Sequence, residues 1–222
     1  MIPLKDDNPR TGFPFVNMLF IALNLAIFGM QFFQAPAEAE AFIYKYGAIP
    51  VQIVEGVNLQ ALFTSMFLHG GVMHFLGNML YLYIFGDNVE NLMGSIRYIF
   101  FYALCGVGAA LSHILMDSSS AIPMVGASGA ISGVLGAYMV SYPKARVLVL
   151  VPIVFYITTF RIPAIVVLGF WFLTQVTSGF AALGLNAGGG IAWFAHVGGF
   201  VVGVILVKIF QRRRPRVLEE YY

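Results

Sequence analysis

Charged residues and cysteine are scarce in this sequence. Only 10% of its 222 residues are charged, whereas a soluble domain carries about 25%, so the composition excludes an ordinary water-soluble fold. Cys105 is the single cysteine, which excludes an intramolecular disulfide and a cysteine-based zinc site. The zinc-protease pattern His-Glu-x-x-His is absent as well. A histidine-only zinc site from His69, His74 and His196 is the alternative that remains, and we expect no metal, no cofactor and no nucleic-acid partner.

The chain is instead rich in hydrophobic residues, and these occur in long runs. They account for 59% of the chain, and a run of about 20 apolar residues is long enough to cross the hydrocarbon core of a bilayer. We therefore predict an all-α, polytopic membrane helix bundle with six transmembrane helices in one domain, residues 1–222. The predicted spans are Phe15–Phe33, Gly71–Leu92, Ile96–Met116, Ala127–Tyr142, Pro163–Leu183 and Ile191–Phe210. The apolar stretch Val147–Ile157 is short for a helical span, and we predict a membrane-surface or hairpin segment there.

The distribution of positive charge predicts the orientation. With the N-terminus in the cytoplasm, eleven of the twelve lysine and arginine residues lie inside and only Lys45 lies outside, as the positive-inside rule requires. Residues 1–14 are then a cytoplasmic N-terminus, residues 34–68 an outer loop and residues 211–222 a basic cytoplasmic tail. We expect an integral protein of a prokaryotic plasma membrane, with both termini in the cytoplasm.

Polar side chains inside the predicted spans are the candidate functional residues, because burying them in lipid is costly. Ser128 begins the fourth span, His196 lies near the start of the sixth, and His74 and Asn78 lie early in the second. These three spans all run from outside to inside, so the four side chains share one depth in the outer part of the bilayer. Taken singly, a serine at a helix start is more commonly a cap, and a buried histidine or asparagine more commonly joins two helices.

Together these residues have the composition of a hydrolytic site. A serine hydroxyl is a weak nucleophile without a base, and His196 is the natural base for Ser128. His74 and Asn78 are four residues apart on one helix face, and both donate hydrogen bonds, as an oxyanion site requires. Glu90 lies ~24 Å along the helix from His74, too far to orient His196. The sequence therefore predicts a serine–histidine dyad, with Glu90 in a structural role.

Glycines accompany both members of the predicted dyad. The fourth span contains Gly129, Gly133 and Gly136 at intervals of about one helical turn. The sixth contains Gly199 and Gly203 in a small-xxx-small pattern. Such surfaces let two helix backbones approach closely. Short serine and histidine side chains need that approach in order to meet, so we expect these glycines to be structural.

Short motifs carry these residues, in chain order and in the expected spans. They are His69-Gly-Gly-Val-Met-His74-Phe-Leu-Gly-Asn78, Gly86-Asp87-Asn88-Val89-Glu90, Gly126-Ala127-Ser128-Gly129, and Ala195-His196-Val197-Gly198-Gly199 followed by Gly203. With these motifs the sequence resembles the rhomboid family of intramembrane serine proteases, from about Asn8 to Val207.

The resemblance implies a function and a role for each motif residue. It implies cleavage of other proteins' transmembrane segments near their outer ends, within the lipid bilayer and without metal or cofactor. Ser128 is then the nucleophile and His196 the general base. His74, Asn78 and the Ser128 amide bind the oxyanion, and Glu90 is structural.

Further candidates surround the nucleophile and the predicted substrate entrance. The candidate substrate-binding residues are Gly126, Ala127 and Gly129 beside Ser128, and His69 at the mouth of the site. Members of the family admit substrate beside the fifth span. Pro163–Leu183 and the loop Gly184–Gly190 are therefore the gate candidates.

Two places depart from the family pattern. Where many members carry a tryptophan–arginine pair in the first outer loop, this chain has Gln60 and Ala61, so this loop is anchored in another way. Where some bacterial members have a tyrosine that stacks on the histidine, this chain has Ser132, so His196 is also held differently. Neither departure touches the dyad. The alternative functions are a non-catalytic rhomboid-like binder of membrane segments and a small transporter.

Overall fold

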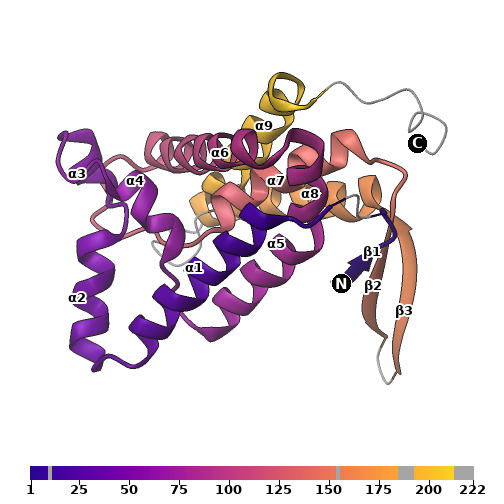
Figure 1. Ribbon diagram of the computed structural model, residues 1–222. Coiled ribbons are helices and arrows are strands. Elements are labelled where there is room, and N and C mark those ends of the chain that lie inside the picture. The colour runs from indigo at the N-terminus through magenta and orange to yellow at the C-terminus, as the bar shows by residue number, and fades with distance from the viewer. Residues whose placement is uncertain (10–11, 154–155, 185–192, 213–222) are drawn as a thin grey trace.

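The computed structural model, which describes residues 1–9, 12–153, 156–184 and 193–212, is a helix bundle with a small sheet at one end (Figure 1). The long helices are α1 (Phe15–Phe32), α5 (Val72–Met93), α6 (Ser95–Met116), α7 (Ser128–Ser141), α8 (Ala164–Gly184) and α9 (Trp193–Phe210). Between α1 and α5 lie the short helices α2 (Pro36–Tyr46), α3 (Pro50–Val54) and α4 (Ala61–Thr64) and the 3₁₀ helix η1 (Ser65–Phe67). The strands are β1 (Ile2–Asp6), β2 (Arg146–Ile153) and β3 (Tyr156–Pro163).

Each predicted span coincides with one of the long helices, but these helices differ in their capacity to cross a membrane. Within the described residues, α1, α6, α8 and α9 are the four that are long and apolar enough to cross alone. Helix α5 has 22 residues but buries polar side chains such as Asn78, Asp87 and Glu90. Helix α7 has only 14 residues, or about 21 Å, which is shorter than the ~30 Å hydrocarbon core. The count of six membrane-crossing helices therefore stays a prediction.

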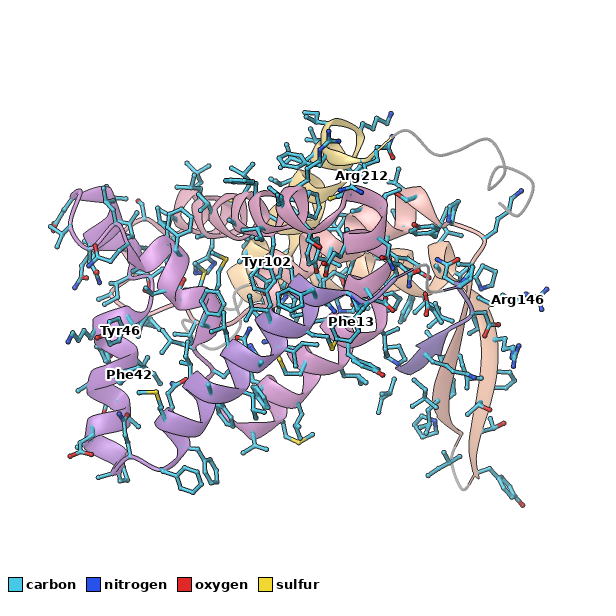
Figure 2. The ribbon with its side chains drawn as sticks, in the orientation of Figure 1. Phe13, Phe42, Tyr46, Tyr102, Arg146 and Arg212 are labelled. Atoms are coloured by element: carbon cyan, nitrogen blue, oxygen red, sulfur yellow. The ribbon has the colours of Figure 1, made fainter. Side chains whose placement is uncertain are left out.

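Helix α7 lies at the centre of the bundle. It contacts α5, α6, α8 and α9, and every residue from Ala130 to Tyr138 is buried. Protein rather than lipid therefore surrounds α7, which lets so short a helix remain at this depth. Figure 2 shows Tyr102 of α6 inside the same bundle, where its ring lies 4.4 Å from the ring of Phe20 on α1.

Helices α7 and α9 approach each other at their glycines. A methyl group at Gly199 would overlap the carbonyl oxygen of Gly129, and one at Gly203 would overlap the carbonyl oxygen of Gly133. The two backbones are thus in direct contact, which only residues without a side chain permit. The glycine spacing of the two helices predicts an approach of this kind.

Glu90 joins two helix starts at the end of the bundle opposite to Ser128. Its buried carboxylate accepts hydrogen bonds from the Val16 and Asn17 amides at the start of α1, at 3.1 and 2.7 Å, and from the Ser95 hydroxyl at the start of α6, at 2.6 Å. The free N–H groups at a helix start carry partial positive charge, so they stabilise the buried carboxylate. This is the contact that a structural role for Glu90 requires.

A three-stranded antiparallel sheet, in the order β1-β2-β3, corrects the all-α prediction. β1 lies within residues 1–14, the expected cytoplasmic N-terminus, for which no strand was predicted. The described residues of Val147–Ile157 lie in β2 and β3, which pair antiparallel from Arg146 and Pro163 to Ile153 and Tyr156, as the hairpin alternative predicts. Val147 and Val149 alternate toward the bundle core and are fully buried there, so β2 has one face on the bundle.

Polar contacts tie the N-terminal strand to the bundle. The Tyr138 hydroxyl of α7 and the Asn88 amide of α5 both donate to the Asp6 carboxylate, at 2.6 and 2.9 Å. The Asn8 amide in turn donates to the Tyr138 hydroxyl at 3.2 Å. β1 is therefore fixed across the ends of α5 and α7.

The segment between α1 and α5 is held against the chain that precedes α7. Ala48 and Met124 exchange two backbone hydrogen bonds of 3.0 and 2.8 Å, and the Gly126 amide donates to the Ser65 carbonyl at 2.9 Å. Ala61 is fully buried in an apolar cluster of this segment. Backbone pairing and a small core therefore anchor the segment where the family's tryptophan–arginine pair is missing.

Replacing Gly203 by alanine should destabilise the protein, because the new methyl group would force α9 away from α7. We expect the free energy of unfolding to fall by about 1–3 kcal/mol, the usual cost of overpacking, in denaturant unfolding of the protein in detergent micelles. Gly169→Ala on α8 is the matched control, since nothing lies within 4 Å of the added methyl group. The control should be neutral or stabilising by up to about 1 kcal/mol. Equal effects of the two substitutions would contradict the close contact.

Candidate active site

Ser128 and His196 are in hydrogen-bonding contact. Ser128 is the first residue of α7, and Ala127 occupies the cap position without a side-chain cap bond, so Ser128 is not a helix cap. The Oγ atom of Ser128 lies 2.8 Å from Nε2 of His196 on α9. Proton transfer from a hydroxyl nucleophile to an imidazole base requires a contact of this length.

The other ring nitrogen of His196 contacts Gln175 of α8. Nδ1 of His196 lies 2.7 Å from Oε1 of Gln175. The Gln175 amide nitrogen faces the Trp171 carbonyl oxygen at 3.4 Å and the Thr174 hydroxyl at 3.3 Å, which directs the amide oxygen toward the imidazole. An amide oxygen only accepts, so Nδ1 carries the proton and Nε2 is free to accept the Ser128 proton. Gln175 thus selects the tautomer in which the ring can act as a base.

Aromatic rings complete the surroundings of His196. The ring centroids of Trp171 and Trp193 lie 6.0 and 6.3 Å from that of the imidazole, tilted by 37° and 89°. Ser132, which stands where some relatives have a stacking tyrosine, donates instead to the Ser128 carbonyl at 2.6 Å. Gln175 and the two tryptophans therefore hold the imidazole in place of that tyrosine.

His74 and Asn78 of α5 present hydrogen-bond donors to the same site. Nδ1 of His74 accepts from the Gly70 amide at 3.4 Å, which leaves the proton of the neutral ring on Nε2. Gly126, with φ +128°, adjoins this ring edge, because a Cβ there would lie 2.8 Å from His74 Nε2 and 3.4 Å from Ser128 Oγ. Nδ2 of Asn78 is buried and forms no hydrogen bond with another described residue. A buried donor without a partner is costly, so a ligand at this position would be stabilised by it.

These side chains open into a cavity of about 1330 Å³. Its lining includes His74, Asn78, Ser128, Gln175 and His196, together with apolar side chains such as Ile131, Leu135, Trp171, Trp193 and Phe194. A pocket for a small molecule measures ~300–1000 Å³, so this cavity has room for a polypeptide segment. The described residues contain no group of three or more histidine, cysteine, aspartate or glutamate side chains placed to hold a metal ion, and so give no support to the histidine-only zinc alternative.

Comparison with known proteins gives the family. The sequence model of the Rhomboid domain matches residues 57–213, more than half of the chain and the whole of this site. The chain belongs to the rhomboid family. Its match to the domain includes α8 and Gln175 as well as the four motif residues.

Rhomboid relatives from several sources are similar to this chain. Rhomboid protein 1, mitochondrial, of Saccharomyces cerevisiae is 27% identical over 209 residues, which cover 90% of this chain and 55% of the yeast protein. RHOMBOID-like protein 6, mitochondrial, of Arabidopsis thaliana is 31% identical over 80% of this chain and 52% of its own length. Rhomboid protease GluP of Bacillus subtilis is 30% identical over 59% of this chain and 25% of its own length. The chain thus spans about half or less of the length of these curated relatives.

The remaining predicted site residues of this rhomboid protein occupy packing positions. Of the four candidate substrate-binding residues, Gly126 adjoins the site, whereas the others do not line the cavity. Ala127 is fully buried, and the Gly129 carbonyl packs against Gly199. His69 is 2% exposed and lies behind His74, with ring centroids 5.2 Å apart. The gate candidate at residues 185–190 lies outside the described residues.

The sequence reasoning missed Gln175 and Trp171. A single amide in the apolar run of α8 is a polar group at membrane depth, which is a functional signal by itself. Trp171 lies four residues earlier, on the same helix face. These signals identify the residues as unusual, but they do not reveal that His196 is the partner.

The lowered pKa of His69 makes the free energy of unfolding depend on pH. Burial, and next the neighbouring His74, lower the pKa of His69 from 6.5 to about 3, against an opposing effect of the Phe67 backbone. The folded protein therefore keeps His69 neutral, whereas the unfolded chain protonates it below about pH 6.5. The unfolded state then binds more protons, so stability is full above that pH and decreases as the pH falls toward 3. The expected loss is about 2 kcal/mol at pH 5.

Replacing His69 by phenylalanine should remove this part of the acid sensitivity. The ring packs edge-on against Phe28 and Phe75, so an aromatic substitute keeps the packing and has no titrating group. The free energy of unfolding of the wild type and of the variant is measured in micelles between pH 5 and pH 8. From pH 8 to pH 5 it should fall by about 2 kcal/mol more in the wild type than in the variant. Parallel pH profiles would show that His69 does not titrate as described.

Proposed function

We propose that this rhomboid protein is a serine endopeptidase that cleaves transmembrane segments of other membrane proteins near their outer ends. The observation that carries the proposal is the 2.8 Å contact between Ser128 Oγ and His196 Nε2, in a cavity walled by helices of the bundle. The Bacillus subtilis relative that is named a rhomboid protease supports the same reaction class.

The reaction begins at the Ser128 hydroxyl. Oγ attacks the carbonyl carbon of the scissile peptide bond while its proton passes to Nε2 of His196. The imidazolium then gives that proton to the leaving amine, which departs and leaves an ester on Ser128. A water molecule, deprotonated by the same nitrogen, hydrolyses the ester and restores the free hydroxyl.

Three donors are available to the oxyanion of the tetrahedral intermediate. The Ser128 N–H is the first of α7, where a helix has no internal acceptor for its amides. Asn78 and His74 of α5 line the same cavity, and their donors are the Asn78 Nδ2 group and the His74 Nε2–H. A strong donor of this kind contributes roughly 3–4 kcal/mol to transition-state stabilisation. Together they supply a large part of the catalysis that a dyad without a carboxylate needs.

Gln175 is the positioning residue of the proposed mechanism. Its oxygen holds the Nδ1 proton of His196, as a carboxylate does in a serine–histidine–aspartate triad. A neutral amide fixes the tautomer and the ring orientation without placing a second buried charge in the bundle. The desolvation cost of a carboxylate is thereby avoided.

The orientation of the bundle belongs to the same proposal. With both termini in the cytoplasm, Ser128 and the cavity lie at the outer side, and substrate reaches them beside α8. The matched relatives include a bacterial and two mitochondrial proteins. They therefore do not single out a prokaryotic plasma membrane, and we place the protein in a membrane without naming which.

Removal of either dyad side chain should abolish cleavage. We expect Ser128→Ala and His196→Ala to lower the cleavage rate of a labelled single-span substrate in liposomes by at least about 10³-fold. Ser112→Ala is the matched control, because that hydroxyl donates to the Gly108 carbonyl within α6, at 2.8 Å, and should leave the rate unchanged. Cleavage by Ser128→Ala at the wild-type rate would overturn the proposal. Substrate binding without any cleavage by the wild type would favour the non-catalytic binder.

Replacing Gln175 by leucine should lower kcat more than it changes KM, because the variant keeps the volume but loses the acceptor for the Nδ1 proton. We expect a decrease of about 10–100-fold, or about 1.4–2.7 kcal/mol. Gln175→Glu retains an acceptor oxygen and should recover most of the rate. Thr177→Val is the control on α8, since among the described residues this exposed hydroxyl bonds to backbone carbonyls of its own helix alone. A wild-type kcat for the leucine variant would exclude a positioning role.

A further inference from the structure

The β2–β3 hairpin leaves the bundle at the end opposite to Ser128. Strand β3 ends at Pro163, and α8, a candidate membrane span, begins at the next residue, Ala164. The base of the hairpin therefore lies where the chain enters the bilayer. Figure 1 shows both strands running crosswise to α6 and past the edge of the bundle. Since α6 is itself a candidate span, the hairpin extends along the membrane surface.

One face of the hairpin is directed toward the bundle, and so toward the membrane. Val147 and Val149 lie on this face, fully buried in the bundle core. Directly paired residues of neighbouring strands share a face of the sheet. Phe160 pairs with Val149, and Thr158 pairs with Val151. Both therefore lie on the same face as the two buried valines.

Beyond the edge of the bundle this face carries exposed aromatic side chains. Phe160 is 46% exposed. Tyr156, two residues before Thr158 and therefore on the same face, is 78% exposed. Aromatic side chains favour the headgroup region of a bilayer, where a ring can be buried while polar groups stay in water.

Basic residues surround the base of the hairpin. Lys5, Lys144, Arg146 and Arg161 are all exposed, and Figure 2 shows Arg146 beside the strands at this base. Asp7 pairs with Arg161 at 3.1 Å, and the remaining Lys5, Lys144 and Arg146 outnumber the neighbouring carboxylate of Asp6, so this region carries a positive charge. Each lysine or arginine near an anionic membrane surface contributes about 1 kcal/mol of attraction.

We propose that the β2–β3 hairpin is a lipid-binding element that lies on the bilayer surface opposite to the cavity. The face with Tyr156, Thr158 and Phe160 rests among the lipid headgroups, and the basic residues at the base favour anionic lipids. The continuity of β3 with α8 makes lipid the partner that this face meets first. Lipid contact then anchors the end of the helix that carries Gln175. The inference depends on the membrane setting of the bundle and is independent of the proposed protease activity.

Spin labels at two adjacent threonines test the proposal. The labels are attached in a Cys105→Ala background, at Thr158→Cys or at Thr159→Cys. Thr158 pairs with Val151 and Thr159 pairs with Leu150. Because successive residues of a strand point to opposite faces, the two labels lie on opposite faces of β3. The protein is reconstituted in phosphatidylcholine vesicles that contain phosphatidylglycerol. We expect the label at residue 158 to be several-fold less accessible to a water-soluble nickel reagent than the label at 159, and more accessible to oxygen. Vesicles without phosphatidylglycerol should weaken this difference.

Removal of the aromatic rings should return the label to water. Tyr156→Ser combined with Phe160→Ser should raise the nickel accessibility of the label at 158 toward that of the label at 159. Ile157→Ser is the matched control, since Ile157 is 75% exposed and lies on the other face, and it should have no effect. Equal water exposure of both labels in all vesicles would overturn the proposal. Spin–spin broadening at residue 158 would instead indicate a second copy of the chain against this face, and would overturn it as well.

Discussion

The direct backbone contact between α7 and α9 is the constraint on which the rest of this structure depends. Gly199 and Gly203 lie against the carbonyl oxygens of Gly129 and Gly133, so no side chain separates the two helices. Serine and histidine side chains are short, and a 2.8 Å contact between them needs backbones this close. The same contact draws α7 to the centre of the bundle. There a helix of 14 residues can be held by protein on all sides.

Polar contacts at both ends of the bundle hold the elements around this central pair. At one end Glu90 receives two amides of α1 and the Ser95 hydroxyl of α6. At the other end the segment between α1 and α5 pairs with the chain just before Ser128 through backbone bonds at Met124 and Gly126. Both sets use neutral donors and helix ends rather than pairs of opposite charges. In a low-dielectric setting this arrangement satisfies buried polar groups at a smaller desolvation cost.

The sequence predicts some parts of the fold and site better than others, for physical reasons. Hydropathy predicts all the long helices, because each apolar run must be buried or lie in lipid. Of the sheet, only the hairpin at Val147–Ile157 was predicted, as one of two alternatives. The pairing of β1 was not predicted, since β1 is a five-residue segment with mixed polarity and its partner β2 lies about 140 residues away in the chain. His69 illustrates a third case. Its motif position indicates the site mouth, but the rings of Phe28 and Phe75 pack against it and place it behind His74.

The sequence by itself predicts that this rhomboid protein is a membrane protein. It also predicts the close helix contact at Gly199 and Gly203, and the positions of Ser128 and His196 at the starts of two helices. These features depend on composition and on spacing along single helices, which are local properties of the chain. What holds His196 was decided only by the tertiary structure. Gln175 reaches Nδ1 because α8 packs beside α9, and nothing in the spacing of residues 175 and 196 specifies a contact of 2.7 Å. The pairing of an amide with an imidazole on another helix depends on how the helices rotate and cross, which is settled by packing of the whole bundle.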